Sequence, residues 1–435
     1  MTINVTNTVG ANNTIVLDSN SKIPAIDGSQ VTALSATAFT TGTLATARID
    51  VGTTAGKVLQ LDGSARIPAL SGANLTNVPG PTSSTSDPAI DTNPTLGAKW
   101  INKTSGEVYI CTDATAGANV WTNVGAGSGD VYPWKFGGEN YGYAAGGYQS
   151  GTTTADVIDK FSLTSDANAT DVGNLTQERH NGAGATSKTY GYKGGGTAVG
   201  PLVRSDRIDK WAFASDGNAT DVGNFLLGWD TCCGSSSENH GYASGGSSYG
   251  SPANYYQDTI QKWAFASDGN ATDVGNSTDG RSFASGHSST TYGYVAGGQA
   301  TFTTWSNIID RFAYASDGNA SDWADISVAR SRAVGISSAT YSYSCGGWNP
   351  AQHWDIIDKF PFASQTNATD IGNLSNGPQR NGAGVSSTTH GYLCGLWGGG
   401  TIYNIIQKFS TTSDGNSSDI ADLTLARYGS SGSQY

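Results

Sequence analysis

One short motif recurs six times, and its regular spacing constrains the fold more than any other feature of the chain. Each copy joins an aromatic or histidine residue, Gly or Ser, a tyrosine and a run of small residues. The central tyrosines are Tyr143, Tyr192, Tyr242, Tyr294, Tyr343 and Tyr392. A fixed period of roughly 50 residues is typical of solenoids, propellers and other repeat arrays.

Each repeat continues in the same order, which predicts four short strands per unit. An Arg-led segment with Gly-Ala-Gly precedes the Tyr-Gly-Tyr strand, and a variable stretch follows it. A third strand comes next, as in Ile158-Asp-Lys-Phe161, and then a turn such as Asp216-Gly-Asn-Ala-Thr-Asp221. Four strands in roughly 50 residues match the size of a propeller blade, so 128–435 is predicted to form a six-bladed β-propeller.

The two ends of the repeat region complement each other. The final segment, 423–433, matches what precedes the later Tyr-Gly-Tyr strands, and the first copy lacks that piece. The C-terminal strand is therefore expected to be the innermost strand of the first blade, which closes the ring without a free edge. We expect the small residues of the Tyr-Gly-Tyr strands to lie where the strands crowd the axis.

Composition agrees with an all-β chain and excludes some partners. Gly accounts for 59 of 435 residues, and the acidic residues are nearly all Asp, which favours turns over helix interiors. The net charge of −12 argues against nucleic acid and against an anionic membrane surface. No apolar run is long enough to span a membrane, and the start of the chain lacks the pattern of a signal peptide.

The N-terminal part is organised differently. Within 1–80 a weaker repeat recurs at an offset of 44, with isolated apolar residues that one chain could not bury. It is either disordered or wound with identical chains into a fibrous shaft, and regularly placed Ile and Leu favour the shaft. A Pro- and Ser-rich linker is expected at 81–95. A small β-hairpin module is expected at 96–127, with its turn at 104–106, and it is too small to stand alone.

These segments resemble two known families. The Gly-Gly-ending strand, the Arg-led strand before it and the aromatic third strand resemble kelch repeats over 139–435, although Thr-Asp-Val-Gly stands where kelch repeats usually place a Trp. The first 125 residues are similar to the modular shafts of bacteriophage tail fibres. That resemblance implies a virion protein made in the host cytoplasm, a homotrimer joined to other tail proteins through its N-terminus, with a kelch-like propeller that binds a host surface glycan or protein.

Variation among the six copies indicates which face would bind. The turn between the third and fourth strands barely changes, whereas the connections from second to third strand and from blade to blade differ. Both variable connections are predicted to lie on one face, and the chain is predicted to enter the ring on the other. The receptor-binding candidates are Tyr148, Tyr255, Tyr256, Phe302, Trp305, Trp348, Trp354, Trp397 and Tyr403. Such aromatics suit stacking on sugar rings, and the alternative is that they cover blade edges.

No catalytic, cofactor or metal site is predicted. The Asp-Gly-Asn-Ala-Thr-Asp turns carry too few carboxylates for calcium and read as hairpin turns with Asx hydrogen bonds. Cys345 and Cys394 read as small packing residues, and the five histidines form no recurring triad. Three functions remain open: a tail fibre that mediates adhesion, a structural decoration fibre on the head or neck, and a glycan-degrading enzyme.

Overall fold

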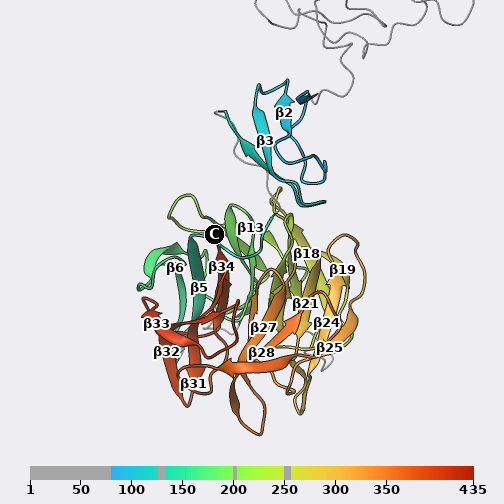
Figure 1. Cartoon of the computed structure of the whole chain (residues 1–435). Helices are drawn as coiled ribbons and strands as arrows, with labels where there is room; N and C mark the ends of the chain where they lie inside the picture. The colour runs from blue at the N-terminus through green and yellow to red at the C-terminus, as the bar shows by residue number, and fades with distance from the viewer. Residues whose placement is uncertain (1–79, 126–133, 152, 199–202, 249–255) are drawn as a thin grey trace, which may run out of the picture. The chain divides into compact units, whose positions relative to one another are not determined.

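The computed structural model describes residues 80–125, 134–151, 153–198, 203–248 and 256–435. These residues form strands and turns, so the chain is all-β, and the described part contains no helix (Figure 1). The predicted shaft, 1–80, lies outside the described residues apart from Gly80. Within the described part, therefore, nothing helical is available that is long and apolar enough to cross a membrane.

The N-terminal described segment is a four-stranded sheet in the order β1-β2-β3-β4. The strands are β1 (Thr82–Ser84), β2 (Lys99–Asn102), β3 (Val108–Asp113) and β4 (Val120–Asn123). The predicted hairpin between β2 and β3 is confirmed. The linker expected at 81–95 needs correction, because β1 lies within it and pairs in parallel with β2.

Residues 134–435 contain six four-stranded antiparallel sheets, numbered here in chain order. Sheet 1 contains β34 (Ser431–Gln434), β5 (Tyr141–Ser150), β6 (Thr153–Ser162) and β7 (Thr170–Asn174). Sheet 2 contains β8 (Ala183–Thr186), β9 (Tyr190–Gly194), β12 (Arg207–Ala212) and β13 (Thr220–Asn224). Sheet 3 contains β15 (Cys233–Ser236), β16 (His240–Ser244), β18 (Thr259–Ala264) and β19 (Thr272–Asn276).

The remaining three sheets repeat this plan. Sheet 4 contains β20 (Ser285–Ser288), β21 (Tyr292–Ala296), β24 (Ile308–Ala313) and β25 (Ser321–Asp325). Sheet 5 contains β26 (Val334–Ser337), β27 (Tyr341–Trp348), β28 (His353–Pro361) and β29 (Thr369–Asn373). Sheet 6 contains β30 (Ala383–Ser386), β31 (His390–Gly398), β32 (Thr401–Ser410) and β33 (Ser418–Asp422). The Tyr-Gly-Tyr copies form every second strand and the Ile-Asp-Lys-Phe copies every third, as the sequence predicts.

The two ends of this region meet in sheet 1. The C-terminal strand β34 pairs antiparallel with β5, with Ser431 opposite Ala145 and Gln434 opposite Gly142. The pairing expected from the split repeat is therefore confirmed. The edge of β5 that would otherwise be free is covered by a strand from the other end of the chain.

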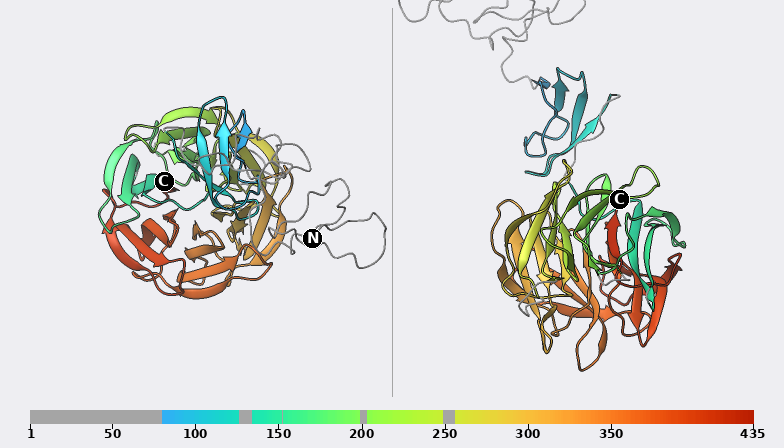
Figure 2. Two further views of the ribbon diagram at one scale, coloured as in Figure 1. Left: turned by 45° about the horizontal axis from the view of Figure 1, so that its top comes forward. Right: turned by 180° about the vertical axis from the view of Figure 1, so that it is seen from behind.

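The turned view in Figure 2 shows the sheets following one another around a common centre. Hydrogen bonds join their first strands in cyclic order. A backbone N–H of each first strand donates to a side-chain oxygen on the next. The donor and acceptor residues are Thr186 to Ser236, Ser236 to Ser288, Ser288 to Ser337, Ser337 to Ser386, Ser386 to Gln434 and Gln434 to Thr186. The series returns to its first member, so each of the six sheets has two neighbours.

Glycine allows the first strands to approach this closely. A Cβ atom on Gly234 would lie 2.0 Å from the carbonyl oxygen of Gly184, far inside van der Waals contact. The same contact recurs around the series, with each glycine against the preceding one: Gly184, Gly234, Gly286, Gly335, Gly384 and Gly432. The crowded small residues thus belong to the first strands, and the expectation that the Tyr-Gly-Tyr strands crowd the axis was wrong.

The hydrophobic core lies between neighbouring sheets. One cluster joins Ala144 and Phe161 of sheet 1 to Ala383 and Tyr392 of sheet 6. Another joins Tyr143 and Ile158 of sheet 1 to Trp211 of sheet 2. Each tyrosine of the repeated motif is buried in one of six such clusters and packs against a neighbouring sheet.

We predict that Gly234→Ala lowers the free energy of unfolding by about 3 kcal/mol, because the added methyl group overlaps a backbone carbonyl that cannot move aside. Urea unfolding followed by tryptophan fluorescence measures the change. Gly217→Ala is the matched control, since a Cβ there has no heavy atom within 4 Å. Equal midpoints for the two variants would contradict the role assigned to the glycine contacts.

Candidate binding face

The two variable connections share one face of the six-sheet region. Isolated bridges join the end of a second strand, or the residues after it, to the segment that precedes a first strand. The bridged pairs are Tyr148 with Tyr428, His180 with Thr197, Ser282 with Gln299, Ser331 with Trp348 and Arg380 with Trp397. In sheet 3 the pair of Trp229 with Ser248 is equivalent. We call this side the loop face, and its position agrees with the sequence prediction.

A central cavity of about 140 Å³ lies between the first strands, and residues from all six of them line it. Phe136, from the segment that enters sheet 1, also lines the cavity. The carbonyl oxygen of Phe136 accepts a hydrogen bond from Gln434 Nε2, and Gly138 N–H donates to Ser386 O. Both partners lie toward the C-terminal ends of first strands, away from the loop face. The entry of the chain opposite the loop face is thus as predicted.

A ring of backbone hydrogen bonds surrounds the loop-face end of the cavity. Each residue of this ring donates its N–H to the carbonyl of the preceding member. The members are Asn181, Thr231, Phe283, Arg332, Asn381 and Gly429, at 2.5–2.8 Å. All six have positive φ, between 54° and 69°, which is uncommon for residues other than glycine and asparagine. We call these six residues the mouth ring.

Three of the predicted tryptophans come together beside this mouth. The rings of Trp305 and Trp348 are 5.4 Å apart in an edge-to-face arrangement. The Arg380 guanidinium lies 4.2 Å from the centre of the Trp397 ring and 5.1 Å from that of Trp348. His353 packs 5.2 Å from Trp397. Sheets 4, 5 and 6 therefore supply one continuous group of aromatic rings around a cation.

The other candidates are more dispersed. Tyr148 contacts the rings of Tyr428 and His180 at 5.1 and 5.3 Å, and its hydroxyl donates to Gly151 O. Tyr256 lies 5.8 Å from Phe302, and Phe302 is 70% exposed. Tyr255 lies outside the described residues.

Trp354 and Tyr403 lie inside strands rather than in the connecting loops. Trp354 is half-buried in β28 opposite Gly347, and its indole nitrogen is buried. Tyr403 is half-buried in β32 and packs against the core of sheets 5 and 6. For these two side chains the edge-covering alternative describes the observed packing.

Two arginines on this face were not among the predicted binding residues. Arg332 belongs to the mouth ring, and its guanidinium lies 3.5 Å from the centre of the Phe283 ring. Arg380 is the cation between Trp348 and Trp397 described above. The usable signal was the two positions that follow Arg179, Trp229, Arg281, Arg330, Gln379 and Arg427 in the six copies. They read His-Asn, Asp-Thr, Ser-Phe, Ser-Arg, Arg-Asn and Tyr-Gly, so arginine appears in only two copies.

Burial makes both arginines easier to deprotonate than usual. Desolvation lowers the pKa of Arg332 to about 10, and the nearby charge of Arg380 acts in the same direction. Desolvation likewise lowers the pKa of Arg380 to about 10. The charge of Asp230 acts against the lowering of the Arg332 pKa, but the Asp230 carboxylate is bound by Thr197, Ser247 and Arg204.

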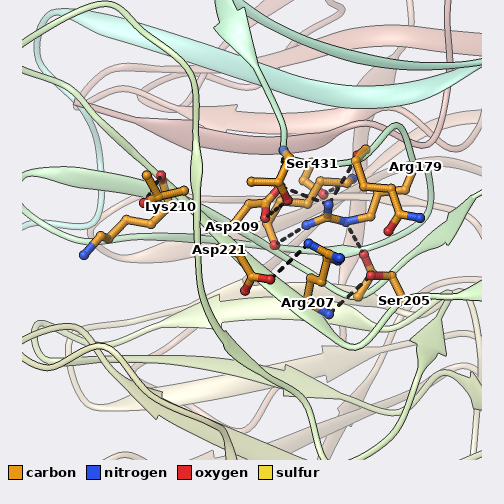
Figure 3. Close-up of polar contacts among 12 residues, drawn as sticks. Arg179, Ser205, Arg207, Asp209, Lys210, Asp221 and Ser431 are labelled. Atoms are coloured by element: carbon orange, nitrogen blue, oxygen red, sulfur yellow. Dashed lines mark hydrogen bonds and ion pairs between the residues drawn. The ribbon is translucent and has the colours of Figure 1, made fainter.

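Other charged groups form closed structural pairs, and Figure 3 shows one of them. Arg179 Nη1 lies 2.9 Å from Asp209 Oδ2, and neither side chain is exposed. Arg179 also donates to the carbonyl oxygens of Gly195 and Lys193, and Asp209 accepts from the backbone and hydroxyl of Thr176. Equivalent pairs are Arg281 with Asp310, Arg330 with Asp358 and Arg427 with Asp159.

The two remaining sheets replace both members of the pair. In sheet 6 the Gln407 amide donates to the Gln379 side chain, and Gln407 Oε1 accepts from Ser375 as Asp209 does from Thr176. In sheet 3 Gln261 stands in place of the aspartate, and Trp229 in place of the arginine. Arginine and aspartate therefore occur together or not at all. The pair is a structural contact that links the segment before the first strand to the third strand of the same sheet.

The repeated turns also join sheets. Asn218 Oδ1 accepts the N–H of Asn174 in the preceding sheet, and Asn270 does the same for Asn224. The Asx interpretation is confirmed for the last aspartate of the turn, since Asp171 and Asp221 accept the N–H of the residue two positions on. It needs correction for the asparagine, whose amide oxygen acts on a neighbouring sheet. Lys160 Nζ likewise reaches Asp216 across the same boundary at 2.8 Å.

Within the described residues, no three His, Cys, Asp or Glu side chains are placed to hold a metal ion. The five cysteines are buried free thiols, in keeping with the packing role predicted for Cys345 and Cys394. No protein-family model and no curated protein matches this sequence.

We predict that Asp209→Ala lowers the free energy of unfolding by about 3–5 kcal/mol, because it leaves the Arg179 charge buried without its partner. Converting both residues to Gln, the combination found in sheet 6, is expected to recover most of that loss. Thermal and urea unfolding measure both effects. A double variant as unstable as Asp209→Ala would show that the Gln–Gln combination of sheet 6 cannot replace the Arg–Asp pair in sheet 2.

Lys193 predicts a pH dependence of stability. Its side chain is buried, and its Nζ donates to Ser431 Oγ at 2.8 Å. Desolvation is the main cause that lowers its pKa to about 7, and the positive charge of Arg179 is the second. Between pH 7 and the usual lysine pKa of about 10.4, the Lys193 side chain is mostly protonated in the unfolded chain and mostly neutral in the folded chain. Stability should therefore rise with pH by up to about 1.4 kcal/mol per unit over this range.

Lys193→Leu, which copies Leu393 of sheet 6, should remove this slope. Unfolding curves of both proteins between pH 7 and 8 measure it as the difference between their slopes, because the thiols of the unfolded chain titrate at about pH 8.5 and contribute equally to both. The same slope in both proteins would assign the effect to another group.

Proposed function

We propose that this chain is a bacteriophage tail fibre whose C-terminal region is a six-bladed kelch-like β-propeller that adheres to the host cell surface. The loop face of the propeller would bind a host surface glycan or protein. The N-terminal residues 1–80 would form a trimeric shaft joined to other tail proteins. The protein would be made in the host cytoplasm and act on the virion.

The propeller architecture is supported by three cyclic sets of contacts. The first strands are linked through side-chain oxygens, their glycines lie against one another, and the mouth ring closes through backbone hydrogen bonds. Antiparallel sheets of four strands stacked in this way are the blades of a propeller. The kelch-like interpretation and the tail-fibre interpretation of the N-terminal segments rest on the sequence motifs.

The observation that carries the adhesion proposal is the cluster of Trp305, Trp348 and Trp397 on the loop face. The connections that hold these side chains differ from copy to copy, while the residues that join the sheets repeat. Half-buried indoles with one edge toward solvent provide large, rigid contact surfaces for a sugar ring or an aromatic-rich protein patch.

We predict that Trp348→Ala and Trp397→Ala each weaken binding at least about tenfold, which corresponds to about 1.4 kcal/mol. The purified full chain would be applied to an array of bacterial surface polysaccharides and to intact host cells. Trp323→Ala is the matched control. Trp323 lies in the outer strand β25 of sheet 4, and its ring packs on the Arg311 side chain.

Wild-type binding in both loop-face variants would contradict the proposed binding face. No binding by the wild type would favour a structural decoration fibre, and shortening of the polysaccharide would favour a glycan-degrading enzyme. Sedimentation of the same sample tests the trimer, and a single species of 44.8 kDa would contradict it.

A further inference from the structure

Two arginines on the loop face, Arg332 and Arg380, form no ion pair with a carboxylate of the described residues. Arg332 Nε is buried and has no hydrogen-bond partner. The contacts of the Arg380 guanidinium are the faces of Trp348 and Trp397. In a protein with a net charge of −12, most other cations of this region have an aspartate or glutamate beside them. This pair is thus an exception that the scaffold does not explain.

The two arginines lie close to each other. Asn381, the residue after Arg380, donates its N–H to the carbonyl oxygen of Arg332 at 2.8 Å. Burial raises the pKa of Tyr428, and the positive charges of both arginines act against that rise. Like charges held together while partly desolvated are unfavourable unless an anion joins them.

The surroundings of the arginines suit a ring-shaped ligand with a negative group. Phe283 covers one side of the Arg332 guanidinium, and Arg332 is one of the residues that line the central cavity. The rings of Trp348 and Trp397 both lie against the Arg380 guanidinium. A guanidinium offers paired N–H donors that match a carboxylate, sulfate or phosphate, and indole faces accept the apolar side of a sugar ring.

We propose that Arg332 and Arg380 form an anion-binding site on the loop face, and that its ligand is an acidic saccharide. The anionic group of the saccharide would lie between the two guanidinium groups, with the sugar ring against Trp348 or Trp397. This inference rests on the proposed adhesive function and narrows its ligand from any surface glycan or protein to a negatively charged polysaccharide. Neutral polysaccharides would lack the group that the arginines require.

The test uses two matched pairs of polymers and the full-length protein. Polygalacturonate is compared with its methyl ester, and dextran sulfate with dextran, so each pair differs in charge and not in the sugar backbone. Binding is measured by calorimetry at two salt concentrations. We expect the charged member of at least one pair to bind, more weakly at high salt, and the neutral members to bind at least tenfold more weakly.

The variants copy residues from other sheets so that folding is preserved. Arg332→Asn matches Asn181 and Asn381 at the same left-handed position, and Arg380→Ser matches Ser282 and Ser331. Each is expected to weaken binding of the charged polymer at least tenfold. Lys188→Asn removes the same charge from the turn between β8 and β9, where Lys188 pairs with Glu238, and should bind as the wild type does.

The outcomes separate this inference from the proposed function. Failure of both charged polymers to bind, or unchanged binding in Arg332→Asn and Arg380→Ser, overturns the acidic-saccharide site. If these variants adsorb normally to host cells while Trp348→Ala does not, the loop face binds a different ligand and only the present inference fails. If neither set of variants affects adsorption, the adhesive function fails as well.

Discussion

The close approach of six backbone strands is the constraint on which the rest of the structure depends. At the glycines of the first strands a single methyl group would overlap the carbonyl of the neighbouring sheet. This contact sets the distance between sheets and hence the width of the central cavity. It also brings the first strands near enough for the residue two positions after each glycine, which is serine, threonine or glutamine, to hydrogen-bond across the gap. Large side chains are placed farther out, where Tyr143 and its equivalents fill the widening space between sheets.

The repeated charged residues form structural contacts within and between sheets, and where one member of a contact is replaced in a copy, its partner is replaced as well. The buried Arg–Asp pair is retained in four sheets, and both members change together in the other two. A lone buried arginine or aspartate would keep its desolvation cost without the compensating charge, so a change of one member requires a change of the other. The lysine–aspartate pairs at the outer turns face solvent and contribute less, yet they follow the same rule: Arg311, which packs on Trp323, replaces lysine where the facing turn lacks that aspartate.

The sequence predicted the order of strands, the pairing of the C-terminal strand with β5 and the face that gathers the variable loops. These features follow from spacing and from the missing piece of the first repeat, which are visible without coordinates. It did not predict that β1 forms a strand, since Thr82–Ser84 is too short and polar to show a period. Nor did it identify Arg332, because the mouth ring depends on positive φ at one residue per sheet, and the side chains there share no pattern. Trp354 and Tyr403 were chosen as aromatic residues of the variable connections, and variation between copies cannot distinguish a loop tip from the end of a strand.

The mouth ring shows where scaffold and binding surface meet. Its backbone is part of the scaffold, because six hydrogen bonds close it and the left-handed conformation repeats in every sheet. Glycine or asparagine adopts that conformation at the least cost, and three sheets use them. Arginine at this position in sheet 5 adds backbone strain, loses hydration and brings a second cation near Arg380. The contact of the guanidinium with the Phe283 ring of sheet 4 offsets part of the lost hydration. It does not reduce the repulsion between the two positive charges, which an anionic ligand would offset directly.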